Sequence, residues 1–272
     1  MVERSAPSAK AIRGTAAFGK FLAVLQAVAD APQRPNLAEL RRFTNLPRPT
    51  LYRMLAGLKS EGLIVESPEH RRFALGPRLI SLASQSWETS DLRVIAREQL
   101  EKLSSATAET VHLAVPSGTE MIFIDKIESL QSVRMTSRIG VRVPMYATSV
   151  GKAYLAFLGP SETAEVLNSL RLSLRTSKTI TRRPELDVEL RKVRRRGYAL
   201  DLEENEPEIC CIGAPICDRR GLAAGAISLS IPSYRFSKEM QGKFSRIVTA
   251  CAAQISANWS STGPVISDRS DR

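Results

Sequence analysis

Apolar side chains in the N-terminal third of the chain recur at the spacing of an α-helix. From Phe18 to Ala29 they fall three or four residues apart, which predicts a first helix. Asn36 is suited to cap a second, short helix that stops at Thr44-Asn45, because Asn tolerates the left-handed backbone of a tight turn. Pro47 and Pro49 fit the first turn of a third helix, where the N–H groups lack partners. The pattern predicts a helix-turn-helix.

The third helix has two faces of different chemistry. A buried stripe at positions i, i+3, i+4 and i+7 is formed by Leu51, Met54, Leu55 and Leu58. The opposite face combines guanidinium groups, which suit guanine edges or phosphates, with a slim apolar surface that suits thymine methyl groups. An ordinary solvated helix can carry such a face too, but the turn geometry favours DNA. The residues of this helix that we predict to contact DNA are Arg48, Pro49, Thr50, Tyr52, Arg53 and Lys59.

A β-hairpin is expected directly after this helix. Gly62 is placed to end the helix, and residues 63–75 read as two strands around a turn at 67–70, with the second strand beginning at Arg71. Three helices followed by a hairpin make a winged helix. In this wing we predict that Arg71 and Arg72 face the DNA backbone.

Helical and strand patterns alternate through the rest of the chain, which predicts an antiparallel sheet with helices on its faces. The fold class is therefore α+β. The helices are expected around residues 92–103, 163–170, 184–196 and 236–255, and the strands at 111–115, 121–126, 211–217 and 222–231. The expected division is a disordered tail over 1–17, the winged helix over 18–77, a linker helix over 78–90, a second domain over 91–259 and a disordered tail over 260–272.

The composition suits a partner that is a polyanion. The net charge is +11 at pH 7, from 39 Lys and Arg against 28 Asp and Glu. The apolar runs are too short to span a membrane, and the first residues lack the apolar core of a secretory signal. Four cysteines, two of them adjacent, do not suggest a disulfide framework. We therefore expect a soluble, cytoplasmic protein without a membrane partner.

Catalytic chemistry is not indicated by the sequence. The two histidines fall in the predicted wing, His70, and in a predicted strand, His112, so no Cys–His or Ser–His–Asp arrangement emerges. The cysteines fit no zinc spacing. We expect no enzyme activity, no cofactor and no metal. A winged helix that binds protein instead of DNA is the other alternative, and the arginines gathered on one side disfavour it.

Several blocks of the sequence, in order, resemble the IclR-type transcriptional regulators. They are NLPRPTLYRMLAGLKSEGLIVES, RRFALGPRLISLAS, GVRVPMYATSVGKAYLAFL, RGYALDLEENEPEICCIGAPICD and GAISLSIPSYRFS. The resemblance implies a winged-helix DNA reader, a linker helix and a GAF-like effector domain, in a homodimer or dimer of dimers that binds operator DNA near metabolic genes. The chain departs from the usual pattern at Arg41, Asn45, Pro49, Glu208, Cys210 and Ile231.

The predicted effector site combines a helix start with a strand. Residues 147–152 lead into a helix expected over 153–158, and a helix start offers N–H groups and a positive dipole end to a carboxylate. Strand alternation places Ser228 and Ser230 on one face, either toward one ligand or as a polar pair that fills an ordinary sheet. Asp201 either accepts from a ligand hydroxyl or ends a strand. By the resemblance, a small organic-acid effector is bound by Ser149, Val150, Asp201, Ile209, Cys211, Ser228 and Ser230.

Overall fold

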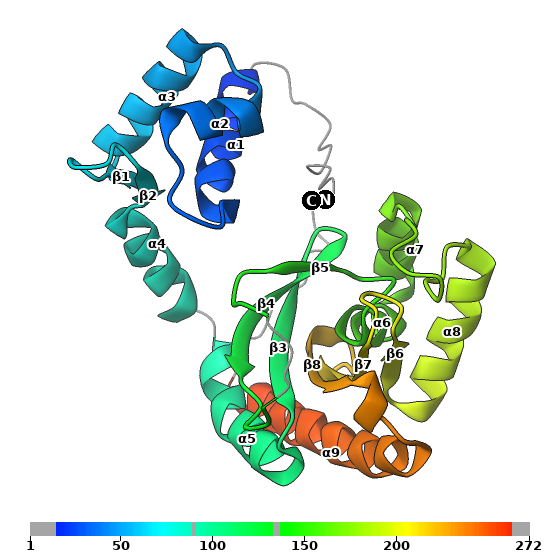
Figure 1. Cartoon of the computed structure of the whole chain (residues 1–272). Coiled ribbons are helices and arrows are strands. Elements are labelled where there is room, and N and C mark those ends of the chain that lie inside the picture. Colours follow the sequence, from blue (N-terminus) through cyan, green and yellow to red (C-terminus); the bar gives the residue numbers. More distant parts are fainter. Residues whose placement is uncertain (1–14, 89–90, 133–136, 263–272) are drawn as a thin grey trace. The chain divides into compact units, whose positions relative to one another are not determined.

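Three helices, a short hairpin and a fourth helix form the described part of the N-terminal unit in the computed structural model, which describes residues 15–88, 91–132 and 137–262 (Figure 1). The unit ends at Thr89. Its elements are α1 (Ala16–Asp30), α2 (Leu37–Thr44), α3 (Arg48–Ser60), β1 (Ile64–Glu66), β2 (Phe73–Leu75) and α4 (Pro77–Glu88). The apolar stripe of α3 packs with Val24, Val28 and Leu40 in one core, as its spacing predicts.

The start of α2 and the turn between α2 and α3 have the predicted chemistry. The Asn36 side chain accepts from the Glu39 N–H, and the Glu39 side chain accepts from the Asn36 N–H, so α2 begins with a reciprocal capping box. The helix ends at Asn45, which adopts the left-handed conformation with φ of 52°. Pro47 is the N-cap of α3, and the helix carries Pro49 in its first turn. These local signals confirm the helix-turn-helix.

The hairpin is shorter than the sequence predicts. The second strand begins at Phe73 instead of Arg71, because Arg71 has a φ of 47° and Arg72 forms an isolated antiparallel bridge with Asn36. The N-terminal tail, predicted over residues 1–17, is also shorter than expected, because α1 begins at Ala16. Residues 1–14 of that tail lie outside the described part of the chain.

The C-terminal unit, which begins at Ser90, is built on one six-stranded antiparallel sheet of order β5-β4-β3-β8-β7-β6. The strands are β3 (Thr110–Ser117), β4 (Glu120–Ile127), β5 (Arg142–Pro144), β6 (Ala199–Leu202), β7 (Ile209–Cys217) and β8 (Ala223–Pro232). The helices are α5 (Asp91–Thr107), α6 (Ser149–Ala156), α7 (Pro160–Ser169), α8 (Arg183–Arg196) and α9 (Lys238–Thr262), with a 3₁₀ turn at Ser233–Arg235. The α+β class is confirmed.

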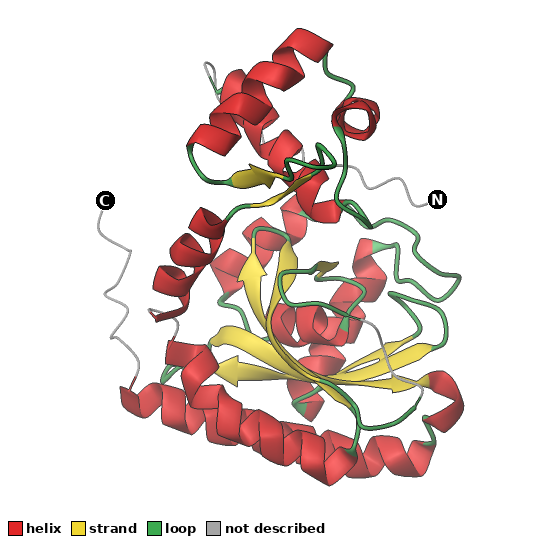
Figure 2. Ribbon diagram, turned by 60° about the vertical axis from the view of Figure 1, so that its left-hand side comes forward, coloured by secondary structure: helices red, strands yellow, loops and turns green. Residues whose placement is uncertain are grey.

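Each face of this sheet has its own apolar core. On one face, the alternate residues Val111, Leu113 and Ile212 pack against α5 and α9, and Figure 2 shows the long α9 lying beneath the curved sheet. On the other face, the smaller side chains Ala199 and Ala226 pack with α6 and α8. The small residues of this second face let the start of α6 approach the sheet closely.

Three predictions about this unit need correction. The helix expected over 153–158 is displaced, because α6 already begins at Ser149, inside the segment 147–152, and ends at Ala156. The C-terminal tail does not start at residue 260, since α9 continues to Thr262; residues 263–272 lie outside the described part. The three-residue strand β5 was not predicted, and the four-residue strand β6, considered only as a strand that ends at Asp201, continues to Leu202. In the described ranges, no helix has the length and hydropathy needed to cross a membrane.

Candidate DNA interface and effector site

The predicted reading face of α3 is open to solvent. Thr50 is half-buried, and Tyr52 is 65% exposed. The exposed residues of the face are Arg48, Pro49, Tyr52, Arg53, Ala56 and Lys59. Because the apolar stripe on the opposite side is buried in the core of the unit, the geometry leaves this face available to a large partner. Its basic and slim apolar groups are chemically suited to the major groove.

Two of the basic residues predicted to contact DNA also make contacts within the unit. Lys59 Nζ lies 2.8 Å from Glu66 Oε2 and so ties α3 to the hairpin. Arg72 donates to the Arg34 carbonyl oxygen at 2.5 Å and lies 3.4 Å from Glu39 Oε2. Arg71, by contrast, is exposed at the turn of the hairpin. The structure thus gives Arg72 a role in holding the wing against α2, which the sequence did not indicate.

The predicted effector residues of the strands lie on one face of the C-terminal sheet. Asp201 on β6 is directly opposite Cys211 on β7, and Cys211 is opposite Ser230 on β8. Since opposite residues of antiparallel strands point to the same side, these three side chains form one row. The next row contains Gly213, Ser228 and His112, which belong to β7, β8 and β3. Alternation also places Ile209 on this face, beyond Cys211.

The start of α6 lies directly on this face. A Cβ atom at Gly213 would fall 2.7 Å from the Ser149 carbonyl carbon and 2.8 Å from its oxygen, so only glycine allows this approach. Thr148 caps the helix by accepting from the Gly151 N–H. The side chain of Val150, the second residue of α6, is buried in the apolar core. The structure therefore brings the start of α6 against the face of the sheet that carries the predicted effector residues of the strands.

Asp201 is a carboxyl group in an unfavourable place for a negative charge. Burial raises the pKa of Asp201 to about 7, and the neighbouring charge of Glu204 adds to the rise. The Lys152 charge and the N–H groups of Glu204 and Asn205 lower this pKa in part, the latter two donating to Oδ1 at 2.8 and 3.3 Å. Asp201 therefore changes charge near neutral pH.

A chain of hydrogen bonds crosses the sheet face that carries Asp201, Cys211, Ser228 and Ser230, which we call the polar face. Cys211 Sγ is 3.2 Å from Ser230 Oγ, and Ser230 Oγ is 3.4 Å from His112 Nδ1. Burial holds the pKa of Cys211 well above its usual range, so the thiol stays protonated at neutral pH. A protonated, buried thiol suits a pocket wall and not a nucleophile.

The sequence did not single out the ion pair that stands behind the helix start. Lys152, with 1% of its side chain exposed, places Nζ 2.5 Å from Glu204 Oε1. Glu204 Oε2 has no hydrogen-bond partner among the described residues, and burial raises the Glu204 pKa. The only sequence signal was a lysine in the first turn of an otherwise apolar segment.

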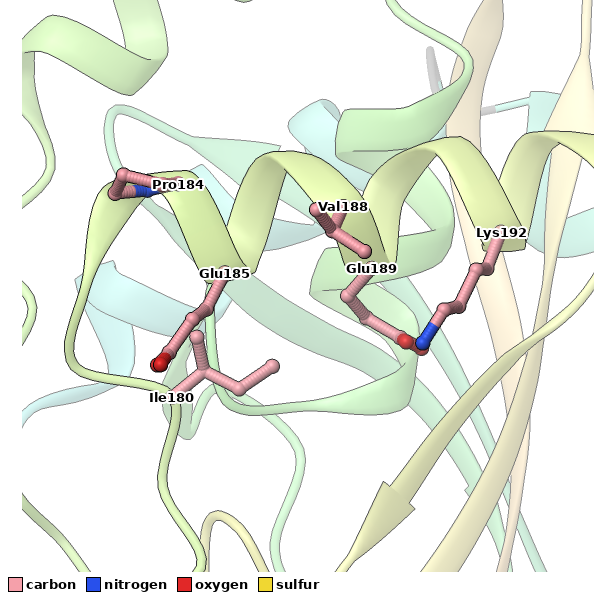
Figure 3. A pocket seen from close by; sticks show the side chains of 6 residues that line it. All are labelled: Ile180, Pro184, Glu185, Val188, Glu189 and Lys192. Carbon is pink, nitrogen blue, oxygen red and sulfur yellow. The ribbon is translucent and has the colours of Figure 1, made fainter.

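A separate groove of about 380 Å³ lies along one side of α8. Figure 3 shows its lining side chains, which come from α8 and the preceding loop and are Ile180, Pro184, Glu185, Val188, Glu189 and Lys192. It shares no residue with the polar face. Within the described residues, no three His, Cys, Asp or Glu side chains gather in a way that would hold a metal ion.

Comparison with known proteins settles the family. The profile described as "Bacterial transcriptional regulator IclR C-terminal" matches residues 84–257, and the "IclR helix-turn-helix domain" matches residues 19–68. This chain belongs to the IclR family. The transcriptional regulator KdgR of Escherichia coli is 33% identical over 238 residues, which are 88% of this chain and 90% of KdgR.

Two further IclR relatives cover nearly the same span. The acetate operon repressor of Salmonella typhimurium is 28% identical over 89% of each chain. The crystal structure of Thermotoga maritima IclR has a TM-score of 0.73 and 33% identity, over 89% of this chain and 98% of its own. The chain is accordingly a DNA-binding transcriptional regulator and not an enzyme.

Proposed function

We propose that this IclR-family regulator is controlled by a small organic acid that binds between the start of α6 and the polar face of the sheet. The observation that carries the proposal is the juxtaposition of Ser149 with Gly213, on a face that also presents Ser228, Ser230 and Asp201. Buried hydroxyl groups beneath a helix start match an anion better than an apolar ligand.

The chemistry of the face favours a ligand with a carboxylate and a second oxygen. The first N–H groups of α6, at Ser149 and Val150, have no partner inside the helix and lie at its positive dipole end. The hydroxyls of Ser228 and Ser230 supply donors on the sheet. A 2-oxo, hydroxy or aromatic acid meets both sets, and Ile209 supplies apolar contact at the end of the face.

The DNA target follows from the family and the charge. We propose that the regulator acts in the cytoplasm as a homodimer or dimer of dimers on operators of metabolic genes, as the name of the acetate operon repressor indicates for that relative. Two identical subunits require two half-sites related by symmetry, with reading helices about 34 Å apart or a multiple of it.

The proposal is tested by operator binding with and without acids. Genomic fragments retained by the full chain are titrated at graded salt, where each neutralised phosphate contributes about −0.9 to the log–log slope. Pyruvate, lactate and benzoate are then added at constant ionic strength. A change in operator affinity with one of them supports the proposal, and a reciprocal change in acid affinity on adding DNA must accompany it. A chain that retained no DNA at any salt concentration would instead indicate a protein-binding wing.

Arg53→Ala is expected to weaken operator binding by about 1–3 kcal/mol and binding to random DNA by much less, because a bidentate contact with guanine is lost. Arg53 lies on the exposed face of α3. Fluorescence anisotropy with both DNA types measures the two losses. The matched control is Arg191→Ala on the exposed side of α8, which should change neither. Equal losses on both DNA types would make Arg53 a phosphate contact.

Effector affinity is expected to fall as pH rises through about 7. Below this pH, Asp201 is neutral, and above it a carboxylate faces the bound anion, since burial raises its pKa to about 7. The loss approaches tenfold per pH unit where binding requires the neutral form, or about 1.4 kcal/mol. Calorimetry with one acid from pH 6 to 8 measures the slope, which Asp201→Asn should remove. A slope retained in that variant would assign the titration to another group.

A further inference from the structure

His112 lies on the polar face but was not among the residues predicted to bind the effector. It is fully buried on β3, between Ser228 on β8 and Lys126 on β4. Its ring stacks on Phe123 with centroids 4.3 Å apart and an interplanar angle of 22°. The stacking fixes the plane of the ring, and each ring nitrogen lies near the hydroxyl group of a different serine. Nδ1 is 3.4 Å from Ser230 Oγ and Nε2 is 2.6 Å from Ser137 Oγ.

The imidazole is neutral at physiological pH. Burial lowers the pKa of His112 to about 3, and the positive charge of Lys126 contributes to the fall. A neutral imidazole has one N–H donor and one acceptor nitrogen. The tautomer therefore decides what His112 offers to Ser230.

Two observations select the Nδ1–H tautomer. A separation of 2.6 Å is short for an N–H donor, whose usual distance to oxygen is about 2.9 Å, and suits a hydroxyl of Ser137 that donates to Nε2. In addition, Lys126 Nζ donates to the Ser137 carbonyl oxygen at 2.8 Å, so a cation stands on the Nε2 side. A positive charge there favours the lone pair at Nε2 over an N–H group.

This tautomer determines how Ser230 can bind a ligand. The Ser230 oxygen has two lone pairs and one hydrogen. His112 Nδ1–H donates to one lone pair, and the protonated thiol of Cys211, at 3.2 Å, can donate to the other. The hydroxyl hydrogen of Ser230 is then left for a third partner, and that partner must be an acceptor.

We propose that His112 is a positioning residue of the effector site, which as the Nδ1–H tautomer directs the Ser230 hydroxyl hydrogen toward the effector and so selects a carboxylate or keto oxygen. The inference rests on the proposed function, because it assigns a cause for acid specificity at that site. An effector that offers only donors to Ser230 is disfavoured, since the site then lacks an acceptor there.

The first test is the tautomer itself, measured by long-range ¹H–¹⁵N correlation spectra of the full chain labelled at histidine nitrogen. His70→Gln identifies the exposed His70 signals. We expect a protonated Nδ1 and an unprotonated Nε2 for His112, unchanged from pH 5 to 8 and on addition of pyruvate. A protonated Nε2 in either state overturns the inference. No substitution of His112 is needed, so this test does not depend on how a variant folds.

The second test uses two amides that mimic different nitrogens of the ring. In His112→Asn the amide nitrogen can occupy the place of Nδ1, whereas in His112→Gln it can reach the place of Nε2. We expect His112→Asn to retain pyruvate affinity within about threefold, and His112→Gln and His112→Leu to lose about tenfold, the usual effect of one hydrogen bond. As the matched control, Ser169→Leu at the exposed end of α7 should change neither pyruvate affinity nor operator affinity without acid, and circular dichroism verifies that all the variants are folded.

The outcomes separate the inference from the function on which it rests. If His112→Asn loses as much affinity as His112→Leu, the donor at Nδ1 has no role and the inference is wrong, although the effector site stands. If pyruvate, lactate and benzoate all fail to bind the unaltered chain, the proposed effector class is wrong, and the tautomer measured without ligand still decides the state of His112.

Discussion

Replacing Lys152 with Met is expected to destabilise the C-terminal domain by about 3–5 kcal/mol, because it leaves a buried carboxylate without its partner. The side chain of Lys152 is 1% exposed and that of Glu204 is 11% exposed, with Nζ and Oε1 2.5 Å apart. Met has a similar length and fills the same space, so the loss reports on charge and not on a cavity. The loss should shrink as pH falls, since protonation of Glu204 removes the unpaired charge.

Chemical denaturation of the full chain measures this effect. The chain has two tryptophans, and Trp259 packs against the apolar core under the sheet. In a Trp87→Phe background, the fluorescence of Trp259 therefore reports on this domain alone. Lys152→Met combined with Glu204→Gln should recover most of the stability, because neither partner is then charged.

The neighbouring ion pair of Lys178 and Glu203 gives a matched control. Glu203 is the residue next to Glu204 in the chain, but Lys178 has 56% of its side chain exposed. Lys178→Met should leave the unfolding midpoint nearly unchanged, since exposed ion pairs contribute little. If Lys152→Met also unfolded at the midpoint of the unaltered chain, the buried pair would have no net effect on stability.

The elements that the sequence predicts best are those with local signals. The cap at Asn36, the left-handed Asn45 and the four-residue stripe of α3 each act within a few residues, and all three appear as expected. Short edge strands have no such signal. Strands of three and four residues, such as β5 and β6, are too short for alternation to stand out from a loop.

The polar face is assembled from strands that are far apart in the sequence, and no local pattern predicts how those strands pair. Alternation alone places Ser228 and Ser230 on one side of β8. It cannot place Cys211 next to Ser230, or His112 next to Ser228, because those neighbours come from other strands of the sheet. His112 and Ser230 are separated by 118 residues, and Lys152 and Glu204 by 52. The family resemblance supplied part of this set, and the structure adds His112 and the buried ion pair.

For Arg72, the sequence suggested a contact with DNA but did not indicate the contacts that this residue makes within the protein. An arginine in a predicted wing suggests a phosphate contact, and composition gives no reason to expect an internal partner. In the structure its guanidinium reaches the Arg34 carbonyl and Glu39, because the residue bridges to Asn36 instead of extending β2. A contact of Arg72 with DNA stays a prediction. Arg71, which is exposed at the turn, is the better placed of the two for a phosphate contact.

Ser228→Leu is expected to abolish the response of operator binding to an organic acid while operator binding itself persists. Ser228 is 3% exposed and lies in the row between Gly213 and His112. Ser228 is opposite Gly213, on which the Ser149 backbone rests, so we expect a leucine at 228 to fill the proposed ligand site beside the start of α6. Operator titrations with and without pyruvate, lactate and benzoate measure the response.

Two further variants separate loss of the site from loss of the fold. Ser169→Leu makes the same substitution at the exposed end of α7 and should respond like the unaltered chain. Ser228→Ala adds no volume and removes one hydroxyl, so it should weaken the acid by about tenfold without abolishing the response. Circular dichroism verifies that each variant is folded. A folded Ser228→Leu that still responds fully would place the ligand elsewhere.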